Sequence, residues 1–162
     1  MVALTCHPGY YLSGMVCLPC SSTTSGIATC LDPTTPITCK SGFYYNSNSC
    51  ISCLSTNTGS LTCADSFTAY TCNIGYYLSG VKCLSCSSAN PGFATCSGSS
   101  TALTCNSGYY KSGTTCLSCS SADPGFATCS DASTVLTCKS GYYMQGATCL
   151  KCSSTDPSFA TC

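Results

Sequence analysis

The spacing of the cysteines is the feature of this sequence that most restricts its fold. The 20 cysteines are separated by steps of 11, 3, 10 and 9 residues, repeated without exception, so the unit C-x10-C-x2-C-x9-C-x8 recurs with a period of 33. We label the four cysteines of each unit a, b, c and d. The a cysteines are Cys6, Cys39, Cys72, Cys105 and Cys138; b are Cys17, Cys50, Cys83, Cys116 and Cys149; c are Cys20, Cys53, Cys86, Cys119 and Cys152; d are Cys30, Cys63, Cys96, Cys129 and Cys162.

The period divides the chain into repeats. Residues 1–5 end a preceding repeat, four complete repeats cover 6–38, 39–71, 72–104 and 105–137, and residues 138–162 form a truncated fifth. The opening MVALTC matches the later junctions STALTC and STVLTC, and no charged and apolar leader precedes it. We therefore expect a segment of a longer secreted precursor.

The composition excludes several classes of function. Five Lys and five Asp are the only Lys, Arg, Asp or Glu residues, so there is no basic patch for a nucleic acid to bind. No run approaches the length of apolar sequence that spans a membrane. Leu, Ile, Val and Phe together number 25 of 162, which is too few for an ordinary hydrophobic core. Covalent cross-links are expected to replace that core.

Three chemistries are available to the cysteines. Zinc would need thiolates or histidines in tetrahedral sets, but each unit has one C-x-x-C and the chain has only one histidine, His7. A redox C-x-x-C would need the start of a helix in a βαβ unit, and the surrounding Ser, Thr and Gly show no helical period. Structural disulfides are therefore favoured, with no bound metal and no cofactor.

The pairing of the cysteines depends on the register of a hairpin between a and c. In the fourth repeat a three-residue loop, 111–113, places Cys105 opposite Cys119 and leaves Cys116 for Cys129. This favours pairing a with c and b with d. A two-residue loop shifts the register and makes a with b and c with d the competing pattern. Pairing of d with the next a stays open as well.

Other residues recur with the cysteines. A Thr precedes every a and every d, which predicts short extended segments there. Pro91-Gly92 and Pro124-Gly125 suit type II turns, with Gly at positive φ. A pair of aromatic residues follows Gly in every repeat, and we expect the rings to form a ladder along the array, with a carbohydrate-binding strip as the alternative. These pairs are Tyr10 and Tyr11, Phe43 and Tyr44, Tyr76 and Tyr77, Tyr109 and Tyr110, and Tyr142 and Tyr143.

No catalytic residues stand out, and we expect no enzyme. The chain has no Glu, and its Asp residues fall at scattered unit positions, neither paired for acid–base chemistry nor clustered for calcium. His7 occurs in one repeat only. The 29 Ser and 23 Thr include clusters at 21–25, 97–101 and 153–155 that are candidates for O-linked sugar.

The string C-x-x-G-Y-Y-x-x-G-x-x-C-x-x-C resembles growth-factor-receptor-type, furin-like cysteine-rich repeats. Together with the Ser/Thr-rich, weakly charged segments, it is similar to surface proteins of protists, including ciliate immobilisation-antigen-like proteins. The resemblance covers all five units. It implies a secreted or surface-anchored, disulfide-bonded, extended molecule, and it transfers no ligand site.

We therefore expect a small disulfide-rich fold, mostly irregular with short β-hairpins, in an elongated rod or solenoid of five tandem 33-residue repeats. The expected function is that of a non-catalytic extracellular structural protein, a surface coat or filament component that self-associates head-to-tail or laterally. The alternative is a receptor- or adhesin-type module that recognises protein or glycan. That alternative predicts a distinctive patch in the divergent first two repeats, where His7, Pro33 and Pro36 occur.

Overall fold

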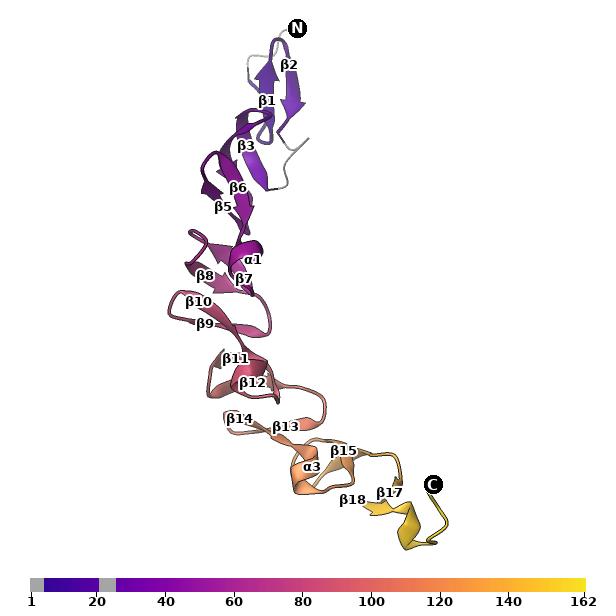
Figure 1. Ribbon diagram of the computed structural model, residues 1–162. Coiled ribbons are helices and arrows are strands. Elements are labelled where there is room, and N and C mark those ends of the chain that lie inside the picture. The colour runs from indigo at the N-terminus through magenta and orange to yellow at the C-terminus, as the bar shows by residue number, and fades with distance from the viewer. Residues whose placement is uncertain (1–4, 21–25) are drawn as a thin grey trace. The chain divides into compact units, whose positions relative to one another are not determined.

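The computed structural model describes residues 5–20 and 26–162 and consists mainly of short antiparallel hairpins (Figure 1). Every sheet formed by these residues has two strands. Hairpins that begin with an aromatic pair alternate along the chain with hairpins that end at a cysteine a. Among the described residues, a single helical turn follows the hairpin with the aromatic pair in four of the repeats. The predicted end of a preceding repeat, apart from Thr5, and the serine cluster at 21–25 lie outside the described residues.

The a–b hairpins lie between cysteines a and c of one repeat and carry cysteine b on their second strand. They are β1 (Tyr10–Ser13) with β2 (Val16–Pro19), β5 (Phe43–Asn46) with β6 (Ser49–Ser52), β9 (Tyr76–Ser79) with β10 (Lys82–Ser85), β13 (Tyr109–Ser112) with β14 (Thr115–Ser118), and β17 (Tyr142–Gln145) with β18 (Thr148–Lys151).

The d–a hairpins join cysteine d of one repeat to cysteine a of the next. They are β3 (Ile27–Asp32) with β4 (Thr35–Cys39), β7 (Ser60–Cys63) with β8 (Ala69–Cys72), β11 (Phe93–Gly98) with β12 (Thr101–Cys105), and β15 (Phe126–Cys129) with β16 (Val135–Cys138). One helical turn precedes each of the last three d–a hairpins: α1 (Cys53–Thr56), α2 (Cys86–Ala89) and α3 (Cys119–Ala122). A 3₁₀ turn, η1 (Cys152–Ser154), follows the last a–b hairpin.

The turns of the a–b hairpins have two residues, not the three that the sequence favoured. Ser112 pairs with Thr115, which leaves Gly113 and Thr114 in the loop. Gly113 has φ +61°, as the first central residue of a type II′ turn requires. In the second repeat Ser47 and Asn48 occupy this loop with φ of +46° and +64°, the type I′ combination that Asn tolerates well.

The shorter loop changes the register of the whole hairpin. Tyr109 pairs with Ser118, and the backbone N–H of Cys119 donates to the carbonyl of Gly108 at 2.9 Å. The same bond from cysteine c to the Gly before the aromatic pair occurs in all five repeats, at 2.8–3.0 Å. Cysteine a therefore does not reach cysteine c, because it already belongs to the preceding d–a hairpin.

The disulfides consequently join a with b and c with d, and the favoured a–c and b–d pattern is wrong. The bonds are Cys6–Cys17, Cys20–Cys30, Cys39–Cys50, Cys53–Cys63, Cys72–Cys83, Cys86–Cys96, Cys105–Cys116, Cys119–Cys129, Cys138–Cys149 and Cys152–Cys162. Each a–b bond links a d–a hairpin to the a–b hairpin that follows it wherever both hairpins are described. The c–d bonds Cys53–Cys63, Cys86–Cys96 and Cys119–Cys129 each link the start of a helical turn to the strand that follows it. Consecutive elements are thus fastened to one another along the chain.

The threonines that precede cysteines d and a face each other across the d–a hairpins. Thr128 pairs with Thr137 in the strand register, and their hydroxyl oxygens lie 2.6 Å apart. The same contact recurs at 2.6 Å in the other three d–a hairpins. The extended segments predicted at these threonines are confirmed.

The Pro-Gly sequences do not form the predicted type II turns. Neither Gly92 nor Gly125 is among the residues with positive φ. Instead, the side chain of Asp123 accepts a hydrogen bond from the N–H of Gly125 at 2.7 Å after one turn of helix. Gly is needed because a Cβ at residue 125 would lie 2.6 Å from the Tyr142 ring and 2.7 Å from the Cβ of Cys149.

The buried side chains form small, separate clusters built around sulfur. In one of them Phe126 is 3% exposed among Cys119, Cys129, Val135 and Cys149. Phe93 holds the same place in the preceding repeat, with Ala102 in place of Val135. These clusters contain few aliphatic groups, as expected from the small number of Leu, Ile and Val residues in the sequence.

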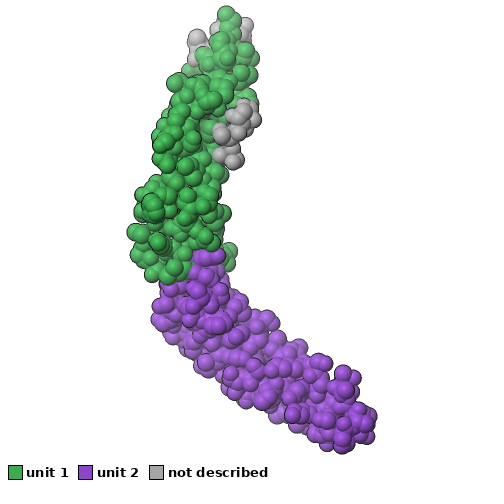
Figure 2. Space-filling view, in the orientation of Figure 1, with its two compact units in different colours: residues 1–74, 78–84 green, residues 75–77, 85–162 purple. Residues whose placement is uncertain are grey.

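The chain divides into two compact units (Figure 2). The first comprises residues 1–74 and 78–84, and the second comprises residues 75–77 and 85–162, so the boundary falls in the β9–β10 hairpin. Elements in extensive contact lie close in sequence order, as in β4 with β6 and β12 with β14. Each unit is therefore a series of locally connected elements.

Candidate functional site

The aromatic pairs flank the sulfur clusters. Tyr109 packs against the cluster around Phe93, whereas its neighbour Tyr110 packs against the next cluster, around Phe126. The two rings of one pair thus connect successive clusters within the second unit. Of the ten paired aromatic residues, Tyr44 is buried, Tyr10 is 49% exposed and the other eight are partly buried.

A second series of apolar side chains is exposed to solvent at a constant position. The residue two places before cysteine a is large and apolar in each described repeat junction, and its exposure ranges from 54 to 63%. These residues are Ile37, Tyr70, Leu103 and Leu136. They lie on the second strand of each d–a hairpin, next to an inward-facing neighbour such as Ala102. Sequence analysis did not single out this position, although the 33-residue period contains the signal.

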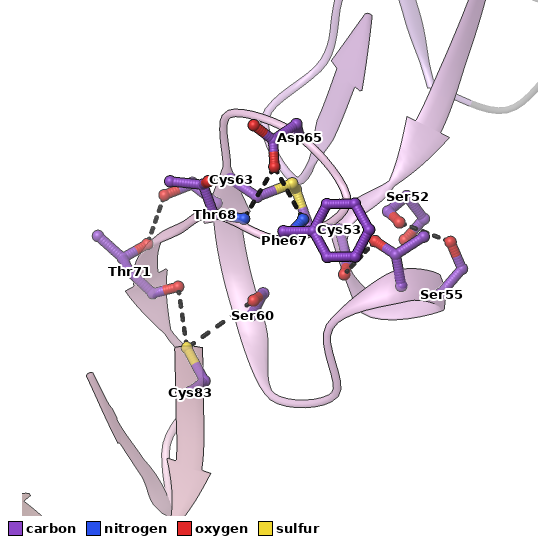
Figure 3. Close-up of a disulfide and its surroundings, with 12 residues drawn as sticks. Ser52, Cys53, Ser55, Ser60, Cys63, Asp65, Phe67, Thr68, Thr71 and Cys83 are labelled. Atoms are coloured by element: carbon purple, nitrogen blue, oxygen red, sulfur yellow. Dashed lines mark hydrogen bonds between the residues drawn. A yellow bond between two sulfur atoms is a disulfide. The ribbon is translucent and has the colours of Figure 1, made fainter. Parts of the chain in front are cut away.

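The sequence analysis treated the aspartates as scattered, but they occupy two recurrent turn positions. Asp32, Asp65 and Asp131 each follow cysteine d by two residues, and Asp123 and Asp156 each follow cysteine c by four. The Asp65 side chain accepts hydrogen bonds from the backbone N–H groups of Phe67 and Thr68, at 2.8 and 2.9 Å (Figure 3). These carboxylates therefore fasten turns.

The hydrogen bonds stabilise the charged form of four of these carboxylates, those of Asp32, Asp65, Asp131 and Asp156. The backbone N–H of Ser133, followed by the Ser133 and Thr134 hydroxyls, lowers the pKa of Asp131 to about 2. The backbone N–H of Thr34 is the largest cause of the lowered pKa of Asp32, and that of Phe67 is the largest cause at Asp65. At Asp156 the hydroxyl of Ser158 lowers the pKa most.

The second repeat departs from the cluster pattern. Ser60 takes the place that Phe93 and Phe126 hold elsewhere, and it is fully buried. Its hydroxyl donates to the sulfur of Cys83 at 3.8 Å, beside the Cys53–Cys63 disulfide (Figure 3). This replaces a phenyl ring with a weak polar contact.

A pocket of about 160 Å³ lies where the first d–a hairpin meets the second a–b hairpin. Its lining consists of Ile27, Pro33, Thr34, Pro36, Asn48, Ser49 and Cys50. Ile27 and Pro36 are buried, and none of the lining residues carries a charge. The pocket is in the two repeats that the sequence identifies as most divergent, and it includes both prolines peculiar to the first.

His7 does not take part in this pocket. Its side chain is exposed, and its backbone carbonyl accepts a hydrogen bond from the N–H of Tyr10 at 3.1 Å. Lys40, Asn106 and Lys139 make the same backbone contact in other repeats. His7 is therefore one of several residue types that this turn accepts.

Two of the three Ser/Thr clusters lie in the described residues. Ser99 and Ser100 form the exposed loop of the β11–β12 hairpin. Ser154, at the end of η1, and Thr155, directly after it, are exposed, and their hydroxyls donate to the carbonyls of Lys151 and Cys152. The loop serines are the more accessible candidates for modification.

All twenty cysteines are paired, and ten disulfides in so short a chain are typical of proteins from oxidising compartments such as the extracellular space. Within residues 5–20 and 26–162, no helix has the length and apolar character needed to cross a membrane.

Comparisons with protein-family models, with curated proteins and with solved structures find no match to this chain.

Proposed function

We propose that this chain is a non-catalytic extracellular structural protein whose five Cys-rich repeats form an elongated array that self-associates into a surface coat or filament. The observation that carries the proposal is the series Ile37, Tyr70, Leu103 and Leu136, which we call the exposed apolar series. It presents one apolar side chain to solvent at every described repeat junction. A surface that repeats at a fixed interval offers many equivalent contacts to a second copy.

The local disulfides support an extended arrangement. Each bond spans only 10 or 11 residues, and none joins distant repeats. Such an array is stabilised by bonds within repeats and contacts between neighbours, and nothing in this pattern limits its length. We accordingly propose that residues 6–38, 39–71, 72–104, 105–137 and 138–162 act as the structural repeats.

The charge balance supports association between copies. The net charge is 0, so copies do not repel one another strongly, and proteins near zero net charge associate more readily. The resemblance to furin-like and protist surface repeats agrees with this role. O-linked sugars on Ser99 and Ser100 would lie in the loop of the β11–β12 hairpin.

The proposal is tested by the size and shape of the oxidised protein in solution. We expect concentration-dependent association in sedimentation velocity and elongated particles in negative-stain electron microscopy. Replacing all four residues of the exposed apolar series with Ser should reduce the association constant at least about tenfold, because each lost contact removes buried apolar area.

A matched control replaces Leu31, Phe67 and Ile74 with Ser. These side chains are 67–90% exposed but have no large apolar counterparts in other described repeats. We expect this variant to associate like the unmodified protein. Globular monomers at all concentrations, or equal effects of the two variants, would contradict the proposed function.

A further inference from the structure

The pocket between the first two repeats results from two departures from the repeat pattern. At the position of Phe93 and Phe126 the first repeat has Ile27, whose side chain is smaller than a phenyl ring. At the position of Ala69 and Ala102 it has Pro36. Both Ile27 and Pro36 line the pocket, so the substitutions and the opening coincide.

Pro36 also removes a backbone hydrogen bond. In the next two repeats the N–H of this residue donates to a carbonyl in the following a–b turn: Ala69 to Val81, and Ala102 to Thr114, both at 2.7 Å. Asn48 holds the position of Val81 and Thr114. Pro has no N–H, so the carbonyl of Asn48 cannot receive this bond from Pro36.

The Asn48 side chain connects the two hairpins in another way. Its Nδ2 donates to the carbonyl of Thr34 at 3.1 Å. Thr34 in turn donates its N–H and hydroxyl to Asp32, each at 2.8 Å. These bonds tie the turn that contains Asn48 to the turn of the β3–β4 hairpin, and Asn48 itself is one of the lining residues.

We infer that the pocket binds one aliphatic or aromatic side chain of an extended peptide from a partner protein, with the peptide N–H of that residue donating to the carbonyl of Asn48. The volume of about 160 Å³ is close to that of an engineered protein cavity that accommodates benzene, so it suits one such side chain. Ile27, the two prolines and the Cys39–Cys50 disulfide favour an apolar group. Thr34, Asn48 and Ser49 add polar atoms to the lining, and none of the lining residues is charged. The second and third repeats supply an in-chain donor to the matching carbonyls, from Ala69 and Ala102.

A peptide fits these features better than a sugar does. No aromatic ring is among the lining residues, so a pyranose would lack the flat surface on which its C–H groups could stack. The acceptor at Asn48, by contrast, occupies a place where the same fold accepts a peptide N–H twice.

The test uses two probes that differ in one hydrogen-bond donor. N-acetyl-leucine methyl ester has a single N–H, and its N-methylated form has none. Titrated into the ¹⁵N-labelled oxidised protein, the first should shift the amide signals of Ile27, Thr34, Asn48 and Ser49 in a saturable way. The N-methylated ester should bind about three- to tenfold more weakly, which is what the loss of one hydrogen bond costs.

Two variants restore the pattern of the other repeats. Ile27→Phe fills the pocket and Pro36→Ala returns the in-chain donor, and each should weaken binding of the first probe at least about fivefold. Both introduce residue types that occur at the matching positions of the third repeat, Phe93 and Ala102, so we expect them to fold. Retention of ten disulfides by intact mass checks this. Leu31→Ala, a change of an exposed residue outside the lining, should leave binding unchanged.

Equal binding of the two esters would overturn the role of the Asn48 carbonyl, and unchanged binding to Ile27→Phe would overturn the site. Shifts caused by methyl α-glucopyranoside or N-acetylglucosamine, and not by the leucine ester, would show a sugar site instead. Absence of any shift at the pocket amides up to the solubility limit of the ester would also overturn the inference. Because the probes are monomeric and the readout is local, none of these outcomes depends on whether the protein self-associates.

Discussion

At the residue scale, small side chains determine how closely the repeats pack. Gly125 precedes the buried Phe126, and the ring of Tyr142 and the disulfide carbon of Cys149 occupy the space where its Cβ would lie. Gly92 stands in the same relation to Tyr109 and Cys116. The requirement for Gly is therefore steric at these two positions.

Gly125→Ala should consequently destabilise the second unit. A Cβ at 2.6–2.7 Å from two neighbours forces them apart, and overpacking of this kind costs about 1–3 kcal/mol. Thermal unfolding of the oxidised protein, followed by circular dichroism, measures the loss. Gly98→Ala is the matched control, because its Cβ would meet nothing within 4 Å and its φ is not positive. Equal stability of the two variants would contradict this account.

At the element scale, the turn of the a–b hairpin decides the disulfide pairing. The small disulfide-rich fold with short β-hairpins and the short extended segments before the cysteines follow from spacing and residue type. The register does not, because Gly113 can serve either as the αL residue of a three-residue loop or as the first residue of a type II′ turn. The bond from the N–H of Cys119 to the carbonyl of Gly108, which extends the same hairpin, shows which of the two occurs.

The pocket and the exposed apolar series were harder to predict. The sequence showed that Pro33 and Pro36 were unusual. It did not show that Ile27 of the same hairpin and Asn48 of the next hairpin line a pocket with them. Leu103 alternates with the buried Ala102, so its outward direction depends on strand register. Prediction of either feature would therefore have required knowledge of how neighbouring elements are arranged in space.

Asp131 should make the β15–β16 hairpin sensitive to acid. Its pKa in the folded protein is about 2, below the ordinary value of 3.8, so its hydrogen bonds stabilise the fold fully above about pH 4. This contribution is lost as the pH falls from about 4 through about 2. The carboxyl carbon chemical shift of Asp131, followed by NMR against pH, gives the pKa directly.

Asp131→Asn provides the comparison, since the amide oxygen of Asn accepts the same hydrogen bonds without titrating in this range. The thermal midpoint of the variant should fall less between pH 5 and pH 2 than that of the unmodified protein. An Asp131 that titrates near 4 would show that the turn does not favour the carboxylate.

At the scale of the whole molecule, the disulfides form a series of short closed loops in which no loop encloses another. Under the a–b and c–d pairing, each loop closes before the next begins. Loss of one loop should therefore affect its neighbours and leave distant repeats intact.

Tryptic digestion without reduction distinguishes the two pairing patterns. The chain has no Arg, and cleavage after Lys139 and Lys151 yields the peptides 140–151 and 152–162. With Cys152 bonded to Cys162, peptide 152–162 is released alone with an internal disulfide. Under a–c and b–d pairing it would remain bonded to two other peptides. Mass spectrometry of the digest decides between these outcomes, and a bonded complex would refute the structure described above.

Replacement of Cys119 and Cys129 together by Ser removes one loop without leaving an unpaired thiol. We expect a local loss of about 2–4 kcal/mol, since the loop no longer restricts the unfolded chain. Hydrogen exchange should accelerate in β15 and β16 and stay unchanged in β3 and β4. Uniform acceleration along the chain would indicate a single cooperative unit, contrary to the local contacts.

The series of closed loops also limits how far the molecule can be drawn out under tension. When a repeat is pulled, its a–b and c–d loops remain closed, with 5.7 Å between the Cα atoms of each bridge, as in Cys105–Cys116 and Cys119–Cys129. Only the chain segments between cysteines b and c and between cysteine d and the next a can straighten. At about 3.3–3.6 Å per residue, an oxidised repeat reaches about half the contour length of a reduced one. The redox state of the surroundings would therefore set the reach of the chain as well as its stability.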